Sequence, residues 1–234
     1  MTKKSQGDPA AARAYGSGAS SYDHNVKGFD VFARLGFDLS GWRRQAVAEL
    51  NLKPGDTVVD IGCGTGLNFT VLQETITAEG SIIGVDLSAA MLEGARERVE
   101  VNGWKNVELI CADAAQFELE RPVDGVLSAY ALILIADSPR VVEKACAALK
   151  PGGRLSILDM SWPQFCPLWW RHVLFFLRSY GVTADILRAR PWLAVQQSMM
   201  DRLVGFSCRR FWFGFFYLAS GTAHSEPNGT ATSA

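Results

Sequence analysis

Short runs of β-branched and aliphatic residues alternate with longer segments in which apolar residues recur every three or four positions. The apolar runs are TVVDI (57–61), SIIGVD (81–86), VELICAD (107–113), VDGVLSA (123–129) and RLSILD (154–159). The segments 88–103 and 138–153 have helical patterns, with Ser88 as an N-cap candidate and Ser138-Pro139 as a cap followed by a first-turn proline. Pro151-Gly-Gly153 is expected to end the second helix before the fifth strand. This alternation predicts βαβ units around a parallel sheet.

The last apolar segment, residues 203–221, is dense in aromatic residues on both sides of Gly214. A glycine between two apolar runs is typical of a tight connection, so we expect two strands to meet there and complete the sheet as a hairpin. The aromatic side chains are interpreted as core packing. They are Phe211, Trp212, Phe213, Phe215, Phe216 and Tyr217.

The length of 234 residues and the 48% hydrophobic content suit one domain with a sizeable core. We expect a single domain over residues 15–220, with flexible ends at 1–14 and 221–234, where periodic apolar positions are lacking. The formal net charge of −1 gives no electrostatic reason to expect a nucleic acid partner. The five cysteines have no CxxC spacing and the N-terminus has no apolar signal core, which predicts a cytoplasmic, reducing setting and no metal site.

The stretch VVDIGCGTG (58–66) places three alternate glycines after the first predicted strand and before a helix expected near Leu67. Glycines at the carboxyl end of a strand in a doubly wound sheet let a ligand approach the backbone, and the following helix offers free N–H groups. The spacing is GxGxG and not the GxGxxG of dinucleotide-binding turns. Asp86 ends the second strand, where its carboxylate can accept ribose hydroxyls, and Asp113 ends the third. A structural turn at the glycines and a helix-capping role for Asp86 are the alternatives.

In combination, these motifs resemble those of the class I S-adenosylmethionine-dependent methyltransferases, over roughly residues 15–221. The resemblance implies a Rossmann-like, doubly wound α/β fold with a mostly parallel seven-stranded sheet, an antiparallel last strand and helical lid segments. It implies S-adenosyl-L-methionine as the cofactor, with Asp86 on the ribose, Leu87 and Met91 on the adenine, and Asp113-Ala114 at the adenine edge. The residues that it assigns to cofactor binding are Tyr22, Asp60, Gly62, Cys63, Gly64, Gly66, Asp86, Leu87, Met91, Asp113, Ala114 and Ser128.

The lead Tyr15-Gly-Ser-Gly-Ala-Ser-Ser-Tyr22-Asp23 is similar to that of small-molecule and lipid methyltransferases, including ubiquinone and menaquinone C-methyltransferases and bacterial phospholipid N-methyltransferases. The resemblance implies that this segment covers the bound cofactor, with Tyr22 as a lid residue, whereas an ordinary packing tyrosine is the alternative. Many relatives carry histidines after the fourth strand. This chain has Tyr130-Ala-Leu-Ile-Leu134 there, so a histidine acid or base is not expected at that point.

Methyl transfer from an activated sulfonium requires orientation more than acid or base residues. The catalytic candidates are the polar side chains expected to hold a substrate near the strand ends, namely Tyr22, Asp23, His24, Tyr130 and Asp159. None of them is assigned as a general base. Capping, solvent exposure or structural hydrogen bonding is the alternative for each.

Residues 161–180 form an aromatic insertion edged with cations. With Trp169, Trp170 and Phe176, it could lie at a membrane interface, with arginines facing anionic head groups; a helix packed on the sheet is the alternative. Its apolar pieces are shorter than the roughly 20 residues that span a bilayer. Those arginines are Arg171, Arg178, Arg188 and Arg190. We expect lid segments near residues 15–45 and 161–202.

These segments favour a hydrophobic or amphiphilic acceptor, either a small molecule or a lipid. A phospholipid head-group amine is the first expectation, and C-, O- or N-methylation of a prenylated quinone or a hydrophobic natural product is the alternative. Peripheral contact with the inner face of the membrane follows from the first expectation, and the oligomeric state stays open. A non-catalytic cofactor-binding module and a hydride-transfer enzyme are the competing classes, the latter disfavoured by the glycine spacing.

Overall fold

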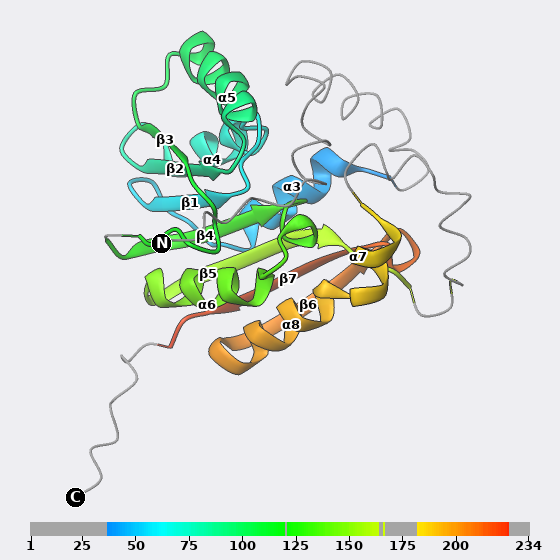
Figure 1. Cartoon of the computed structure of the whole chain (residues 1–234). Helices are drawn as coiled ribbons and strands as arrows, with labels where there is room; N and C mark the ends of the chain where they lie inside the picture. The colour runs from blue at the N-terminus through cyan, green and yellow to red at the C-terminus, as the bar shows by residue number, and fades with distance from the viewer. Residues whose placement is uncertain (1–36, 120, 164–165, 167–181, 225–234) are drawn as a thin grey trace, which may run out of the picture.

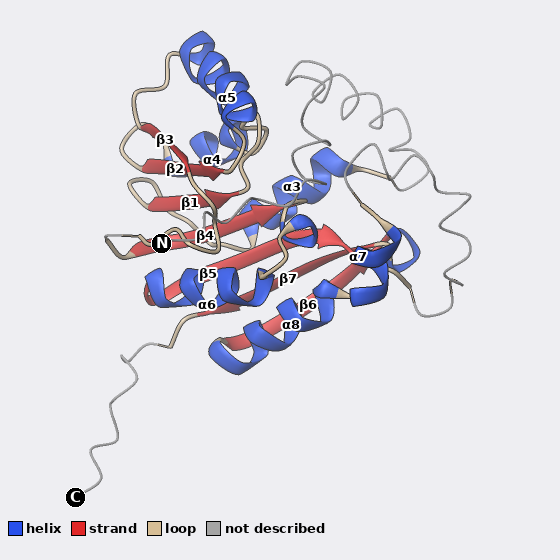
Figure 2. Cartoon of the chain, viewed as in Figure 1, coloured by secondary structure: helices blue, strands red, loops and turns tan. Residues whose placement is uncertain are grey.

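The computed structural model describes residues 37–119, 121–163, 166 and 182–224, and these contain one seven-stranded sheet with helices on both faces (Figures 1 and 2). The strands are β1 (Thr57–Ile61), β2 (Ser81–Asp86), β3 (Val107–Cys111), β4 (Val123–Ala129), β5 (Leu149–Met160), β6 (Val204–Phe211) and β7 (Phe216–Thr222). The helices are α3 (Leu39–Ala48), α4 (Phe69–Ile76), α5 (Ala89–Asn102), α6 (Ser138–Ala148), α7 (Ala184–Ala189) and α8 (Pro191–Arg202), with short 3-10 turns at Leu132–Leu134 and Trp212–Gly214.

The strand order is β3-β2-β1-β4-β5-β7-β6, and β7 is antiparallel to both of its neighbours. The neighbouring pairs among β1 to β5 are all parallel. The chain starts in the middle of the sheet, moves outward to β3 and then returns to the other side of β1. This confirms the predicted Rossmann-like, doubly wound fold with an antiparallel last strand.

Alternating strand residues feed two separate cores, one on each face of the sheet. Val58 of β1 and Leu158 of β5 pack with α3, α4 and α5, whereas Val59 and Ile157 pack with α6 and α8. Each strand therefore buries both of its faces, which explains why the strands are continuous apolar runs. The colours in Figure 1 show that α3, α4 and α5 on one face precede α6 and α8 on the other face in sequence.

The predicted N-cap is confirmed for helix α5 and wrong for helix α6. Ser88 caps α5 as predicted, since its Oγ accepts a hydrogen bond from the Met91 N–H at 3.3 Å. The predicted Ser138 cap is wrong: the N-cap residue of α6 is Asp137, and Ser138 is the first helical residue, with its side chain buried. Pro139 still lies in the first turn, where its missing N–H costs nothing.

The fifth strand is longer than predicted. It begins at Leu149 and includes Pro151-Gly152-Gly153, so helix α6 ends at Ala148, before these residues. Leu149 pairs with Val123, and the register shifts before Gly125 pairs with Arg154. The shift in register allows the proline and the glycines to lie within the strand. The apolar periodicity of the sequence does not predict this extension of the strand.

The C-terminal aromatic segment forms the expected hairpin of β6 and β7. Phe216 and Tyr217 are buried, as predicted for core residues. The core interpretation of Phe213 is wrong, since this side chain is 77% exposed at the hairpin tip. Because β6 runs parallel to β5, this tip lies at the same edge of the sheet as the carboxyl end of β5.

The predicted lid segments 15–45 and 161–202 end within the described helices α3 and α8. Helix α8, inside the segment 161–202, packs on the sheet through Trp192, Val195 and Met199. Its packing is that of a core helix. Within the described part of the chain, no helix has the length and hydropathy that a membrane span needs.

Phe69 joins helix α4 to the sheet by filling the space beside two glycines. A Cβ atom on Gly66 would lie 2.6 Å from Phe69 Cδ2, and one on Gly84 would lie 2.8 Å from Phe69 Cζ. Both distances are too short for carbon atoms in contact, so the ring requires glycine at both positions. Phe69 itself is completely buried.

Replacing Phe69 with alanine should lower the free energy of unfolding by about 3–5 kcal/mol, because a large cavity would remain between α4 and β2. Urea denaturation followed by circular dichroism measures this. Phe213→Ala is the matched control, and its effect should stay within about 0.5 kcal/mol because the ring is exposed. Equal losses in the two variants would contradict the packing described for Phe69.

Candidate active site

The carboxyl ends of β1, β2, β3 and β4 meet at one edge of the sheet, where β1 has β2 on one side and β4 on the other. The helices that follow β1 and β4 cover opposite faces of the sheet. Such a point of reversal is the general ligand-binding position in open α/β sheets. The described residues that the sequence assigns to cofactor binding lie at these strand ends or in the loops after them, except Met91, which lies in the first turn of α5.

The three glycines of the loop after β1 are required for different reasons. Gly62, Gly64 and Gly66 all have positive φ, at 66°, 57° and 75°. A Cβ on Gly62 would meet the Ala131 Cβ at 2.3 Å, and one on Gly66 would meet the Phe69 ring. A Cβ on Gly64 would approach only the Met91 Cε, at 4.0 Å. Gly64 is therefore the position at which the backbone borders space that a ligand can fill.

Asp86 fixes the shape of this loop. Its Oδ2 accepts a hydrogen bond from the Gly64 N–H, and its Oδ1 accepts one from the Ser88 N–H, both at 2.8 Å. Burial raises the pKa of Asp86, although these N–H groups favour the charged form. An ionised carboxylate has about four lone-pair positions, so Asp86 can still accept from a ribose hydroxyl. The adjacent Leu87 is 53% exposed, so its side chain is accessible to a ligand at this edge.

Two further candidates lie on either side of β1. Asp113, after β3, is half-buried, and its Oδ1 accepts a hydrogen bond from the Ala115 N–H at 2.9 Å. Ser128, near the end of β4, donates its hydroxyl proton to the Ile61 carbonyl at 3.0 Å. Ser128 therefore ties the ends of β1 and β4 together, and Asp113 shapes the turn that carries Ala114.

Asp60 is completely buried below the loop and accepts hydrogen bonds from the side-chain amide of Asn68, at 3.0 Å to each carboxylate oxygen. Burial raises the pKa of Asp60 to about 7, against the lowering effects of Asn68 and of the Arg43 charge. Cys63 is buried beside it, and desolvation raises the pKa of its thiol well above the usual value. A thiol in this setting stays protonated and is no nucleophile.

The sequence interpretation missed Asn68 and Arg43. Arg43 lies on the buried face of α3 together with Trp42, Ala46 and Val47. A charged residue on an otherwise apolar helix face is a signal that could have identified it, because an arginine is rarely buried without a partner. Asn68 carries no comparable signal, since an asparagine before a helix is ordinary in capping positions.

The five catalytic candidates separate into two groups. Tyr22, Asp23 and His24 lie outside the described residues, as do Trp169, Trp170, Arg171 and Arg178 of the insertion. Tyr130 directly follows β4 and has a φ of 61°, a left-handed conformation that costs energy for a residue with a large side chain. Its N–H donates to the Leu158 carbonyl at 2.7 Å, which holds Tyr130 at the edge where the cofactor residues gather.

Asp159 of β5 is buried, and its carboxylate accepts hydrogen bonds from the Ile133 N–H at 2.8 Å and from the Met160 N–H at 2.7 Å. Burial raises its pKa to about 7, while the backbone N–H groups lower it. This geometry favours a role in positioning the turn at Leu132–Leu134 over direct contact with a substrate. Arg188 and Arg190 are exposed, and Arg188 pairs with Asp185.

Tyr130 belongs to a cluster of aromatic side chains at this edge of the sheet. Trp42 stacks on Phe211 with ring centroids 5.2 Å apart, and the Phe216 ring lies 5.1 Å from Trp42 and 6.0 Å from Tyr130. We use the name aromatic wall for Phe37, Trp42, Tyr130, Phe211, Trp212 and Phe216. Four of these rings are only half-buried, so apolar surface remains available beside the cofactor edge.

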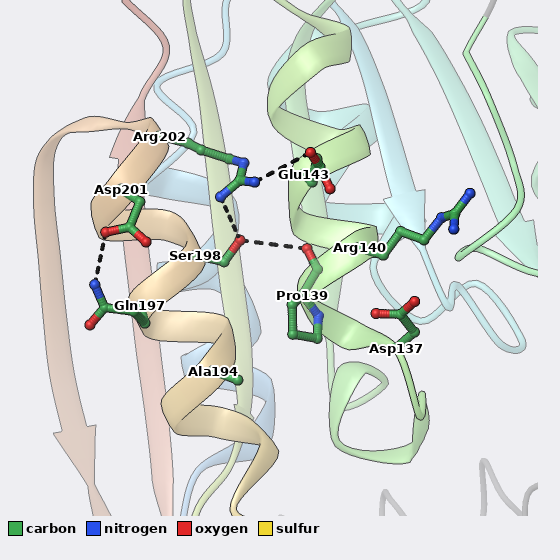
Figure 3. A pocket seen from close by; sticks show the side chains of 9 residues that line it. All are labelled: Asp137, Pro139, Arg140, Glu143, Ala194, Gln197, Ser198, Asp201 and Arg202. Atoms are coloured by element: carbon green, nitrogen blue, oxygen red, sulfur yellow. Dashed lines mark hydrogen bonds and ion pairs between the residues drawn. The ribbon is translucent and has the colours of Figure 1, made fainter.

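A different hollow, of about 540 Å³, lies between α6 and α8 (Figure 3). Arg202 of α8 crosses it, pairing with Glu143 of α6 at 3.3 Å and donating to the Ser198 hydroxyl at 3.3 Å. None of the predicted site residues lines this hollow. It is a groove between two packed helices, and its lining includes both carboxylates and arginines. Among the residues that the structure describes, no cluster of histidine, cysteine or carboxylate side chains is placed to hold a metal ion.

Comparison with known proteins agrees with this geometry. Residues 52–178 match a family model described as a methyltransferase domain. The chain is 36% identical over 125 residues to the demethylmenaquinone methyltransferase of Symbiobacterium thermophilum, covering 52% of this chain and 49% of that protein. It is 31% identical over 185 residues to the demethylmenaquinone methyltransferase of Listeria monocytogenes, covering 73% of this chain and 78% of that protein.

A solved structure shares the fold. It is a geranyl diphosphate C-methyltransferase from Streptomyces coelicolor in complex with S-adenosyl-L-homocysteine, with a TM-score of 0.64 and 17% sequence identity. The match covers 79% of this chain and 76% of that one.

Gly64→Ala should weaken S-adenosyl-L-methionine binding by about tenfold or more, because the new methyl group would occupy space needed by the ligand. Gly103→Ala is the matched control: Gly103 also has a positive φ, of 68°, and open surroundings, but it ends α5 outside the site. Both variants should lose similar stability, about 1 kcal/mol, from backbone strain. Titration calorimetry gives the affinities. If folded Gly64→Ala bound the cofactor with normal affinity, the role of Gly64 would be limited to the conformation of the turn.

Asp86→Ala should weaken cofactor binding by about 1.5–3 kcal/mol, because it removes the acceptor for the ribose and the anchor of the Gly64 N–H. Asp56→Ala serves as control, since Asp56 also accepts a backbone N–H, from Lys53, but at the amino end of β1. Calorimetry on both folded variants decides the role of Asp86. An unchanged dissociation constant for Asp86→Ala would remove it from the cofactor site.

Proposed function

The chain belongs to the class I S-adenosyl-L-methionine-dependent methyltransferases, and we propose that its methyl acceptor is a ring carbon of a prenylated quinone of the demethylmenaquinone type. The observation that carries this proposal is the 31% identity to the Listeria monocytogenes enzyme over 73% of this chain. The aromatic wall beside the cofactor edge gives it independent physical support.

The cofactor supplies an activated methyl group on a sulfonium, so the protein's task is to hold two partners in line. On the cofactor side we assign the ribose hydroxyls to Asp86, the adenine to Leu87, Met91 and Asp113, and the methionyl end to the Gly64 backbone. Gly64 is suited to this position because its missing side chain leaves the loop open there.

On the acceptor side, the aromatic wall suits a flat, fused ring. Tyr130 directly follows β4, and Phe211 and Trp212 lie at the end of β6 on the same edge of the sheet; all three keep part of their surface exposed. A bicyclic ring that packs against these side chains excludes water from the reacting atoms and gains the attraction of offset or edge-on ring contacts. The ring carbon of a reduced quinone is electron-rich and needs no strong protein base to make it a nucleophile.

No described side chain is well placed as a general base. Asp60 and Asp159 have a pKa near 7, which would suit proton transfer, but both are buried and bound to Asn68 or to backbone N–H groups. We therefore propose that this chain contributes orientation and exclusion of water, and that the proton displaced from the ring leaves to solvent or through the reduced quinone itself.

The phospholipid amine, our first expectation from the sequence, now ranks second. It rested on arginines near aromatic residues, and two of these arginines, Arg171 and Arg178, lie outside the described residues. Arg188 is engaged with Asp185. The sequence relatives, which are demethylmenaquinone methyltransferases, favour the quinone.

Incubation of the purified protein with S-adenosyl-L-methionine and a reduced demethylated naphthoquinone should give a product heavier by one methylene group, with the methyl located on the ring by fragment-ion mass spectrometry. Vesicles of phosphatidylethanolamine in a parallel reaction should give no methylated amine. Asp86→Ala should slow the quinone reaction strongly at limiting cofactor, in line with its weaker binding.

Methylation of the amine alone would replace the quinone by a phospholipid acceptor. Cofactor binding without methylation of either compound, or of a panel of hydrophobic phenols, would instead favour a non-catalytic cofactor-binding module.

A further inference from the structure

Three polar side chains form a buried chain from helix α3 to the loop after β1. The Arg43 Nη1 donates to the Asn68 Oδ1 at 2.7 Å, and the Asn68 Nδ2 donates to both oxygens of Asp60 at 3.0 Å. Arg43 is 8% exposed, Asn68 2% and Asp60 0%. We call these three residues the Arg43 relay.

Burying such groups is costly unless each is paired. Asn68 bridges the two charged groups with a neutral side chain, whose oxygen accepts from one N–H of the guanidinium and whose amide donates to the carboxylate. The charges of Arg43 and Asp60 therefore act on each other across one amide group. A direct ion pair between Arg43 and Asp60 would neutralise more of the carboxylate charge and so weaken its attraction for a cationic ligand.

Arg43 also reaches the acceptor side. Its guanidinium carbon lies 4.7 Å from the centroid of the Tyr130 ring, a distance at which the cation attracts the aromatic face. Tyr130 has the strained φ of 61° at the end of β4. One arginine thus contacts a residue beside the acceptor and, through Asn68, the acid beneath the cofactor loop.

We propose that Arg43 and Asn68 are positioning residues that keep Asp60 ionised for the ammonium group of the cofactor's methionyl end and that couple this end of the site to Tyr130. The proposal rests on the assignment of the methionyl end to the loop above Asp60. It does not depend on which acceptor receives the methyl group.

The direction of the pH effect follows from the groups that face Asp60. Arg43 from α3 and Asn68 from the start of α4 lower the pKa of Asp60, Asp86 from β2 raises it, and burial raises it most, giving about 7. The Cys63 thiol nearby is neutral at these pH values because its own pKa is raised. Asp60 therefore gains a proton as the pH falls through about 7, and the attraction for the ammonium group is lost on that side.

The test measures binding of S-adenosyl-L-homocysteine by calorimetry from about pH 5.5 to about pH 9 for the parent, Arg43→Gln, Arg43→Lys and Arg44→Gln. In the parent, affinity should fall as the pH drops through the pKa of Asp60. In Arg43→Gln the midpoint should move up by about one pH unit, so affinity should drop about threefold near pH 7.5 and about tenfold near pH 5.5. The ratio of the two affinities should return toward one at high pH, which general damage to the fold would not produce.

Arg44→Gln removes the same charge one residue along α3, where the side chain is exposed, and should leave the midpoint unchanged. Arg43→Lys should have a midpoint close to that of the parent, because the positive charge remains. If Arg43→Gln does not fold, Asn68→Ser breaks the relay at its middle residue and should move the midpoint in the same direction.

Carbon-13 carboxyl NMR of the ligand-free protein gives a second readout, with the Asp60 signal identified by its loss in Asp60→Asn. An Asp60 pKa that is equal in the parent and Arg43→Gln would overturn the proposal, as would an equal shift in Arg44→Gln. Parent binding that is independent of pH would overturn it too, while leaving the quinone assay of the proposed function unaffected.

Discussion

The hydrogen bond from the Gly64 N–H to the Asp86 carboxylate joins the loop after β1 to the end of β2, and the arrangement of the site depends on it. The Val85 carbonyl supports the same loop by accepting from the N–H groups of Gly62 and Cys63 at 2.8 and 3.1 Å. Three backbone donors thus fix the loop against its neighbouring strand. The loop stays close to the sheet only because Gly62 and Gly66 carry no side chain, since a Cβ on either would strike Ala131 or Phe69. Packing and hydrogen bonding together leave Gly64 as the open position.

The same edge of the sheet carries a stability cost. Asp60 and Asp159 each have a pKa raised to about 7 by burial, compared with 3.8 for an exposed carboxyl group. Between these two values the folded protein binds more protons than the unfolded chain, so each group lowers stability as the pH rises from about 4 to about 7. Asp159 holds the turn after β4, and Asp60 holds Asn68 under the cofactor loop. Asp60 and Asp159 are therefore buried at a cost in folding stability, at positions where they fix the shape or the charge of the site. Such carboxyl groups with raised pKa values are common where proteins bind ligands.

Much of the fold was predictable because the signals are local. Continuous apolar runs identified β1 to β5, and Ser88, Gly64 and Asp86 follow strands in positions that their chemistry favours. The Arg43 relay could not be predicted, since its members are 25 and 8 residues apart in sequence and meet only after α3 packs on the sheet. Asp159 is a similar case, because its carboxylate bonds to Ile133, which is 26 residues away. The exposure of Phe213 depends on the exact tip of the hairpin, which composition does not specify.

The central claim is that one edge of the sheet binds the cofactor at Gly64 and Asp86 and presents the acceptor beside Tyr130. A crystal structure of the protein with S-adenosyl-L-homocysteine and a demethylated naphthoquinone tests it most directly. The account predicts ribose hydroxyls on the Asp86 carboxylate, the methionyl end over Gly64 with its ammonium group toward the Asp60 side of the loop, and the naphthoquinone ring against the aromatic wall. Cofactor density away from this edge, for example in the groove between α6 and α8, or a ring that does not contact the aromatic wall, would contradict it.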